Sequence, residues 1–367
     1  MATTATAAAP RTLSPAPATR LSGLPGRFGP NWYAAVMGTA IVANGAHALP
    51  AAVQSRALAD AAAAVWLLSL LMLTALAALR LSARRLPNRI RALDDPATAV
   101  FLGCPPMAML AVGAGALGAG APLVGHGSDA VALDAALWIG GTVYAVGAAA
   151  GIMYLLLNRY RVERAEAAPT LLLPVVAPMV SAALGPALIP HLPAGGQARD
   201  TMLALCVGLF GVSLLATLVL LPGIWSRLIH EGPLPPALVP TLFLVLGPLG
   251  QSVTAATQFT TAAPALRGFA LLYGATVIGF ALLWLGVAVA TTVRTLRSGM
   301  PFAMTWWAFT FPVGTCVTGT AGLWHLTGLD LFAVLSVSLY ALLLTAWTVV
   351  GVRTVRGLAT GVLLPAV

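Results

Sequence analysis

The 367-residue chain contains no lysine and has few charged residues of any kind. Charged side chains make up 8% of the sequence and hydrophobic ones 59%, and the mean hydropathy is +0.92. A soluble domain carries roughly a quarter charged residues. The composition therefore excludes an ordinary soluble protein and indicates a polytopic membrane protein, which at this length can be a single domain.

The sequence is also poor in the residues that build metal centres or disulfides. Its three cysteines, Cys104, Cys206 and Cys316, stand singly inside apolar segments, as small buried side chains do. There is no metal-spaced Cys/His group, no His-Glu-x-x-His helix and no pair of carboxylates inside an apolar segment. These absences predict no cofactor and disfavour a membrane-embedded enzyme.

Ten apolar stretches are long enough to cross a bilayer, which takes about 20 residues. They predict an all-α integral membrane domain over residues 28–352. Residues 1–27 are rich in Ala, Thr and Pro and are expected to form a disordered N-terminal tail, with a short C-terminal tail over 353–367. The predicted spans are 31–49, 61–81, 97–119, 131–157, 170–190, 201–225, 237–258, 268–293, 302–325 and 329–352.

Arginine is distributed unevenly among the predicted loops and termini. By the positive-inside rule, the distribution predicts cytoplasmic termini in a plasma (inner) membrane and supports an even number of spans. The net charge of +9 is then a topology signal, and no nucleic-acid partner is expected. The cytoplasmic set is Arg11, Arg20, Arg27, Arg80, Arg84, Arg85, Arg89, Arg91, Arg159, Arg161, Arg164, Arg227, Arg294, Arg297, Arg353 and Arg356, against Arg56, Arg199 and Arg267 outside.

The acidic residues are expected at helix starts rather than at mid-membrane depth. Asp60, Asp134, Asp200 and Asp330 fall at the outer start of even-numbered spans, where a carboxylate caps free backbone donors. Asp95 before Pro96 predicts another N-cap. Because intramembrane carboxylates usually mark cation sites, their expected absence disfavours a cation-coupled pump. A pathway that opens toward a basic cytoplasmic face suits an anion.

Proline falls on alternate spans. It removes a backbone donor and kinks a helix, and in lipid this is tolerated where protein or a water-filled cavity satisfies the freed carbonyls. The odd-numbered spans are therefore expected to face inward and the even-numbered ones to form an outer wall, as in a pore. The odd-span prolines are Pro105, Pro106, Pro174, Pro178, Pro186, Pro240, Pro248 and Pro312, whereas Pro222 lies near the end of the sixth span.

The ninth span carries the candidate gate. Phe311 precedes Pro312, and Thr315 and Thr318 follow it at helical spacing. If this face lines a pathway, Phe311 is a bulky apolar plug beside a small polar stripe, and a hydrophobic constriction can gate by excluding water. The alternative is an aromatic side chain packed within a helix bundle.

Several motifs occur in order along the chain and together resemble one family. They are Phe28-Gly29-Pro30-Asn31-Trp32-Tyr33, Val36-Met37-Gly38-Thr39, the Pro174 to Pro178 spacing, Leu246-Gly247-Pro248-Leu249-Gly250, and the Trp306-Trp307-Ala308-Phe309-Thr310-Phe311-Pro312 run. From Phe28 to about Val352 the sequence is similar to the tellurite-resistance/dicarboxylate transporter family, which includes slow anion channels, malate permeases and sulfite exporters. Ala40 departs from the pattern, where the family often has a second glycine.

The resemblance implies five helical hairpins in a quasi-five-fold ring, with odd-numbered helices lining a central pore and even-numbered helices outside. It also implies a homotrimer with one pore in each subunit, and it places the occluding aromatic at Phe311. The pore-lining candidates are Thr39, Pro105, Pro178, Pro248, Pro312, Thr315 and Thr318.

The expected function is transport of small anions, such as malate and other C4-dicarboxylates, sulfite or an inorganic anion. The sequence leaves open which anion moves and whether the protein is a channel or a proton-coupled carrier. Sensing of external pH by His47, His126, His191 and His325 also stays open beside an ordinary interfacial role.

Overall fold

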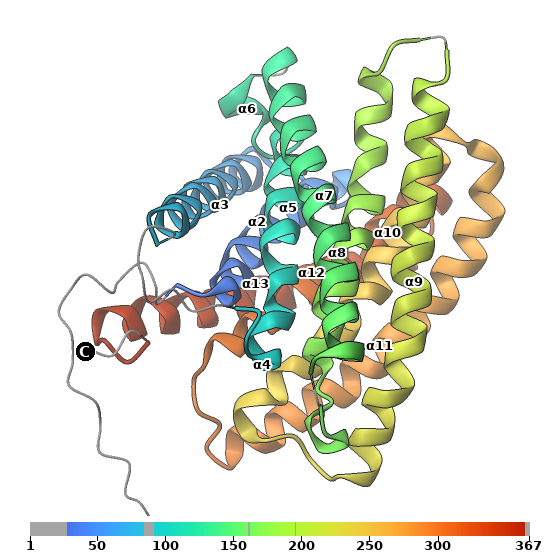
Figure 1. The fold of residues 1–367 in the computed structure, drawn as a ribbon. Helices are drawn as coiled ribbons and strands as arrows, with labels where there is room; N and C mark the ends of the chain where they lie inside the picture. The colour runs from blue at the N-terminus through green and yellow to red at the C-terminus, as the bar shows by residue number, and fades with distance from the viewer. Residues whose placement is uncertain (1–27, 84–91, 126, 161, 195, 364–367) are drawn as a thin grey trace, which may run out of the picture.

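The computed structural model describes residues 28–83, 92–125, 127–160, 162–194 and 196–363. Every regular element in these ranges is helical, which confirms the predicted all-α fold (Figure 1). The N-terminal tail predicted over 1–27 lies outside the described residues. So do Arg11, Arg20, Arg27, Arg84, Arg85, Arg89, Arg91, Arg161 and His126.

Five inner segments share one plan, in which a short 3-10 stretch leads into an α-helix. Proline favours this junction because it fixes φ and needs no hydrogen-bond partner in the first turn of a helix. The segments are η1 (Pro30–Trp32) with α2 (Tyr33–Ala48), η3 (Val100–Gly103) with α5 (Cys104–Leu117), η5 (Pro169–Leu171) with α8 (Leu172–Leu184), η7 (Pro236–Val245) with α10 (Leu246–Ala262), and η9 (Met304–Phe309) with α12 (Phe311–Thr327).

The prolines act differently from the expected mid-helix kinks. Pro105 and Pro106 stand at the start of α5 and Pro312 at the start of α12, whereas Pro178 lies inside α8. Instead of a bend within one α-helix, most of these segments change from a 3-10 helix to an α-helix near the proline. The physical reason is that a first-turn proline costs no hydrogen bond, while an interior one does.

Five longer helices carry the even-numbered predicted spans. They are α3 (Arg56–Ala83), α7 (Ser128–Asn158), α9 (Ala198–His230), α11 (Arg267–Arg297) and α13 (Asp330–Ala359). Residues 353–359 of the predicted C-terminal tail belong to α13. The short connecting elements are η2 (Ala51–Val53), α4 (Pro96–Ala99), α6 (Ala121–Val124), η4 (Arg164–Glu166), η6 (Gly185–His191) and η8 (Pro264–Leu266).

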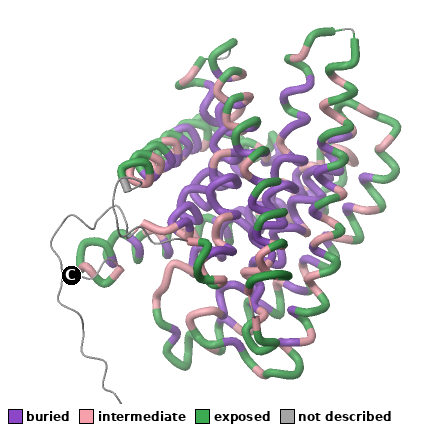
Figure 2. Tube along the Cα trace, in the orientation of Figure 1, coloured by how far each residue is buried: buried purple, intermediate pink, exposed green. Residues whose placement is uncertain are grey.

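Burial separates the two sets of helices. Over the most apolar window of each helix, 72–89% of residues are buried in the segments that contain α5, α8 and α10. The same share is only 28–33% in the five longer helices. The buried residues gather at the centre of the molecule, and the exposed ones lie at its periphery (Figure 2). The proline-bearing segments are thus the core, and the longer helices surround it.

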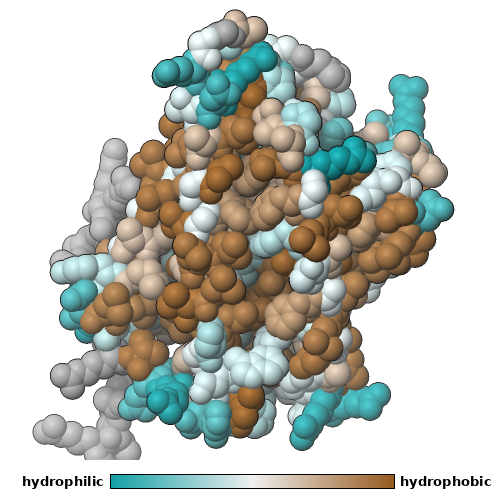
Figure 3. Space-filling model, turned by 90° about the vertical axis from the view of Figure 1, so that its right-hand side faces the viewer, coloured by the Kyte–Doolittle hydropathy of each residue, from teal (hydrophilic) through white to brown (hydrophobic). Residues whose placement is uncertain are grey.

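The exposed side chains of the outer helices are themselves apolar. Examples are Leu215 of α9, Leu283 of α11 and Val334 of α13, each more than 60% exposed. A brown apolar band lies between hydrophilic ends on the face shown in Figure 3. Such a band suits the hydrocarbon core of a bilayer.

Eight helical segments within the described ranges are long and apolar enough to cross a membrane. The first and ninth predicted spans fall short because α2 has 16 residues and α12 has 17. About 20 residues are needed, so these two segments approach or exceed that length only when η1 and η9 are added.

The inner helices pack in a closed cycle. α2 contacts α5, α5 contacts α8, α8 contacts α10, α10 contacts α12, and α12 returns to α2. Each outer helix lies against the inner segments beside it; α3, for example, contacts both α2 and α5. In Figure 1, α2, α12 and α10 lie between α3 on one side and α9 and α11 on the other.

Side chains of all five outer helices donate hydrogen bonds to inner segments. A tryptophan N–H has no water partner in lipid, and a backbone carbonyl can accept a second bond through its other lone pair. The bonds are Trp66 Nε1 to Val112 O (2.9 Å), Trp138 Nε1 to Ser181 O (3.0 Å), Ser213 Oγ to Val175 O (2.6 Å), Trp284 Nε1 to Leu242 O (2.8 Å) and Trp347 Nε1 to Thr39 Oγ1 (3.1 Å).

The helices α10 and α12 pack closely, and a glycine makes this approach possible. A Cβ added at Gly250 would lie 2.5 Å from the backbone nitrogen of Cys316 and 2.5 Å from Thr315. Nearby, Thr254 Oγ1 and Thr318 Oγ1 are 2.8 Å apart across the same interface. Small residues allow such backbone contact in membrane helix pairs.

We expect Gly250→Leu to lower the free energy of unfolding by about 1–3 kcal/mol, the usual cost of overpacking. Two of the three nearest atoms, Cys316 N and the carbonyl carbon of Thr315, belong to the backbone and cannot rotate away. Thermal unfolding of the purified protein in detergent measures the effect. Gly279→Leu is the matched control, because a Cβ at this α11 glycine meets nothing within 4 Å. Equal melting temperatures for the two variants would contradict the packing assigned to Gly250.

Candidate functional site

A small cavity lies where the five inner segments meet. It leaves about 10 Å³, close to the space of a single water molecule. Every inner segment contributes to its wall, and no lining side chain is charged or polar. The lining residues are Met37 from α2, Met107 from α5, Leu172, Leu173 and Val176 from α8, Leu244 and Gly247 from η7 and α10, and Phe311 and Pro312 from α12.

A second cavity, of about 20 Å³, adjoins the first. Met37, Leu173 and Leu244 border both cavities, so they form the partition between the two. Its remaining wall comes mostly from the 3-10 parts of the inner segments and is again without charge. These residues are Ala34, Phe101, Cys104, Thr241, Met304, Thr305 and Ala308.

Phe311 is the first residue of α12 and is 2% exposed. Its position follows from the local sequence, because η9 ends at Phe309 and Pro312 occupies the first turn of the new helix. The Phe311 ring therefore sits at the junction of the two helix types and closes one wall of the smaller cavity.

Pro312, a predicted pore-lining residue, also lines the smaller cavity, whereas the remaining sequence-predicted site residues line neither cavity. Thr39 is buried and its hydroxyl donates to Ala35 O at 2.8 Å while accepting from Trp347 of α13. Thr315 can donate to Pro312 O or Leu246 O, and Thr318 pairs with Thr254. Pro105, Pro178 and Pro248 are buried but do not line either cavity. Their proposed pore-lining roles stay predictions.

Sequence reasoning missed most of the cavity wall. Met37, Met107, Leu173 and Leu244 are apolar residues in apolar segments, so composition does not separate them from ordinary core. A usable signal, a lining residue next to a proline, exists in four of the five segments, as at Gly247 before Pro248. Met107 directly follows the Pro105-Pro106 pair, Leu173 precedes Pro174, and Phe311 precedes Pro312.

One end of the molecule, here called the basic end, carries the C-terminal turns of the outer helices and the 3-10 starts of the inner segments. Arg80 of α3 lies 5.8 Å from the ring of Tyr33, and its Nη1 is buried without a hydrogen-bond partner. Arg353 of α13 lies 4.6 Å from the ring of Trp306. Two guanidinium groups thus stand beside the starts of α2 and α12.

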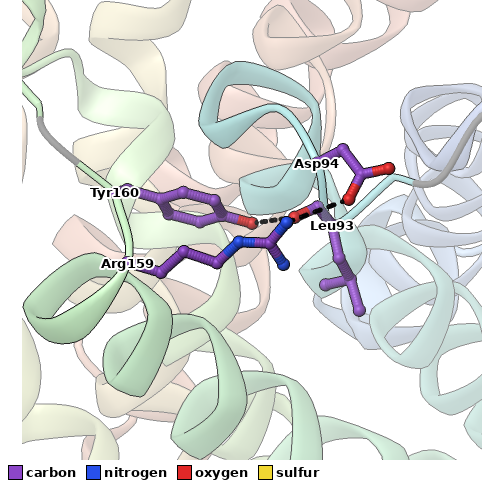
Figure 4. Close-up of polar contacts among 4 residues, drawn as sticks. All are labelled: Leu93, Asp94, Arg159 and Tyr160. Carbon is purple, nitrogen blue, oxygen red and sulfur yellow. Dashed lines mark hydrogen bonds and ion pairs between the residues drawn. The ribbon is translucent and has the colours of Figure 1, made fainter.

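At the basic end, an ion pair and a hydrogen bond connect the segment before α4 to the end of α7. Arg159 Nη2 lies 3.1 Å from Asp94 Oδ1, and the Tyr160 hydroxyl donates to Leu93 O at 2.6 Å (Figure 4). This is the only ion pair among the described residues. Its side chains are more than half exposed, so it adds little stability.

The acidic residues depart from expectation at two positions. Asp95 caps α4 as predicted, accepting from the backbone nitrogens of Ala97 and Thr98. Asp200 and Asp330 lie in the first turns of α9 and α13, but neither is the N-cap residue. The predictions for Asp60 and Asp134 are wrong, because α3 and α7 begin further upstream, at Arg56 and Ser128.

Asp134 is instead a buried carboxyl group between α7 and α5. It is 1% exposed, and its Oδ2 has no hydrogen-bond partner. Gly113 of α5 makes room for it, since a Cβ there would lie 2.9 Å from Asp134 Oδ1. A buried polar oxygen without a hydrogen-bond partner costs free energy, so this position calls for a physical explanation.

A helical bundle with an apolar outer surface, buried inner segments and an uncharged axial cavity defines a multi-pass membrane transport protein. The sequence comparisons place it more closely. The voltage-dependent anion channel family, SLAC1, matches residues 27–355. The chain therefore belongs to this family, as its resemblance to the tellurite-resistance/dicarboxylate transporters led us to expect.

Relatives with transport names match over much of the chain. The sulfite efflux pump SSU1 of Trichophyton rubrum is 26% identical over 345 residues, covering 89% of this chain and 90% of the pump. The SSU1 pump of Arthroderma otae is 27% identical over the same shares. An uncharacterized transporter of Methanocaldococcus jannaschii is 27% identical over 64% of this chain and 71% of its own length.

We expect Asp134→Leu to raise the melting temperature by several degrees, because an apolar side chain of similar size replaces a buried carboxyl group whose Oδ2 has no hydrogen-bond partner. Asp60→Leu, at an exposed position of α3, is the control. Thermal unfolding of the purified protein in detergent measures both variants. A melting temperature that falls in Asp134→Leu, or that rises equally in Asp60→Leu, would refute the assignment.

Proposed function

We propose that this protein conducts small anions across a membrane along the axis enclosed by α2, α5, α8, α10 and α12. In this proposal the chain crosses the bilayer ten times, as five hairpins in a quasi-five-fold ring with the longer helices facing lipid. Phe311 closes the pathway in the state described here.

The observation that carries the proposal is the convergence of all five inner segments on one cavity. Each segment places at least one side chain in the wall that contains Phe311. A bundle built only for packing has no need to bring five distant parts of the chain to one axis. The closed cycle of helix contacts supports the same view.

The chemistry of the axis favours an anion over a cation. None of the residues lining the two cavities carries a negative charge. The α-helices α8, α10 and α12 begin at or beside the lining residues, so the positive ends of their dipoles lie near the axis. Arg80 and Arg353 at the basic end would raise the local anion concentration.

Sulfite is the first substrate to test, because sulfite efflux pumps match 89% of this chain. Malate, other C4-dicarboxylates and inorganic anions are the further candidates from the family resemblance. Closely related folds can carry different substrates, so the family by itself does not select one.

Orientation and assembly complete the proposal. The arginines of the basic end support an orientation with both termini in the cytoplasm and the protein in the plasma membrane. The family resemblance supports a homotrimer in which each subunit has its own pathway.

We expect Phe311→Ala to increase anion flux at least about tenfold, because the mutation removes the ring that closes the smaller cavity and lets water enter. Purified protein reconstituted in liposomes, loaded in turn with sulfite, malate, nitrate or chloride, measures the flux.

Phe259→Ala is the matched control for this experiment. Phe259 is also 2% exposed and lies on α10, but it packs edge-on against Phe210 of α9 and lines neither cavity. Both variants lose a buried ring and some stability. Unchanged flux in folded Phe311→Ala, or an equal increase in both variants, would remove Phe311 as the gate.

A proton-coupled carrier is the second candidate, and Asp134 is the observation that favours it. A buried carboxyl group can hold and release a proton, and such groups mark proton relays in transporters. Coupling predicts that an imposed pH gradient drives anion accumulation in liposomes and that Asp134→Asn abolishes this accumulation. Accumulation that ignores the gradient would favour the channel.

A further inference from the structure

Gln251 is a buried amide without a partner. The residue lies in α10, is 2% exposed, and its Oε1 has no hydrogen-bond partner. No hydrogen bond of its side chain is present among the described residues. Because a buried polar group without a partner costs free energy, its presence calls for a physical explanation. The assignment of oxygen and nitrogen does not matter here, since either orientation leaves one acceptor and two donors unused.

The position of Gln251 on α10 places it next to the cavity closed by Phe311. Gly247 lines that cavity, and Gln251 follows four residues later on the same face, one helical turn further from the basic end. Neighbouring residues of α10 already have contacts. Gly250 and Thr254 meet α12, and Phe259 meets Phe210 of α9.

The axis changes character at this level. Toward the basic end the cavity walls are built from apolar side chains, with Thr241 and Thr305 as the hydroxyl-bearing exceptions. One turn beyond Gly247 of the cavity wall, Gln251 brings an amide. About one turn further, Thr254 and Thr318 bring hydroxyl groups that already bond to one another at 2.8 Å. Of these three side chains, Gln251 is the one with unused hydrogen-bonding capacity.

We propose that Gln251 binds the transported anion directly beyond Phe311 and selects oxyanions that retain one O–H group. This inference rests on the proposed function and names the substrate class of the same pathway. The amide N–H groups donate to an anionic oxygen, while Oε1 accepts from the O–H of the ligand. Hydrogensulfite and a singly protonated dicarboxylate have both features, whereas nitrate and chloride have no hydrogen to donate.

An uncharged amide suits a pathway in which binding must be followed by release. A fixed arginine would hold an anion strongly, while two neutral hydrogen bonds hold it weakly enough to leave. Because Gln251 is uncharged, it does not repel cations. In this proposal the helix dipoles and the arginines of the basic end make the pathway prefer anions over cations, and Gln251 discriminates among the anions.

The test compares wild-type protein, Gln251→Leu and the control Thr257→Val in liposomes. Thr257 lies on the same helix and is buried, but its hydroxyl bonds to the carbonyls of Val253 and Thr254 within α10. Flux of sulfite and of malate is measured in mildly acidic buffer, where the protonated monoanions are present, beside nitrate and chloride.

We expect Gln251→Leu to lower sulfite or malate flux about tenfold, which corresponds to one to two lost hydrogen bonds. Nitrate and chloride flux should change less than about twofold, and Thr257→Val should leave the ratio of the two anion classes unchanged. Gln251→Leu should also melt at or above the wild-type temperature, because it removes an unpartnered amide. Gln251→Met, which has similar length and no strong hydrogen bonds, repeats the test if the Leu variant fails to fold.

The outcomes separate this inference from the proposed function. A wild-type protein that carries none of the four anions refutes the proposed function and this site with it. Wild-type flux restricted to nitrate or chloride refutes the selection of O–H-bearing oxyanions. Sulfite or malate flux that is unchanged in folded Gln251→Leu, or that falls equally with nitrate and chloride flux, refutes the role of Gln251 alone.

Discussion

The structure depends on one constraint, which is that a polar group inside a bilayer must find its hydrogen-bond partner within the protein. The outer helices meet this constraint by turning tryptophan and serine donors inward. Trp66, Trp138, Ser213 and Trp284 each donate to a backbone carbonyl of an inner segment, and Trp347 donates to Thr39. These bonds fix the rotation of each outer helix, so its remaining faces can be purely apolar.

The inner segments meet the same constraint with a different device. Proline at the start of α5 and α12 removes an N–H where a helix begins and where no partner is required. The chain passes from a 3-10 stretch to an α-helix at this level, and the side chains beside the junctions project into a shared cavity. Phe311 and Met107 owe their positions to this arrangement. A constriction is thereby built from backbone geometry and apolar side chains, without any fixed charge.

Several buried polar groups among the described residues lack such a partner, and two of them have functional interest. Gln251 and Asp134 are almost fully buried, and each has an oxygen without a partner. Gln251 lies on an inner helix one turn from Phe311, whereas Asp134 lies on an outer helix against Gly113. Buried polar groups that the fold leaves unsatisfied are where a membrane transporter can meet a substrate or a proton.

The sequence alone determined the all-helical membrane class, because long apolar runs with few charged residues suit the interior of a lipid bilayer and not water. It also singled out Phe311 and Pro312, which line the smaller cavity, since proline and aromatic residues stand out in an apolar helix. Only the tertiary structure decided that Met37, Leu173 and Leu244 form the wall, because identical apolar side chains serve equally as core. The helix starts likewise depended on tertiary context: α7 begins at Ser128, so Asp129 takes the first turn and Asp134 is carried into the bundle. The boundaries of a helix depend on its packing against other helices, and the sequence of one segment does not show which helices those are.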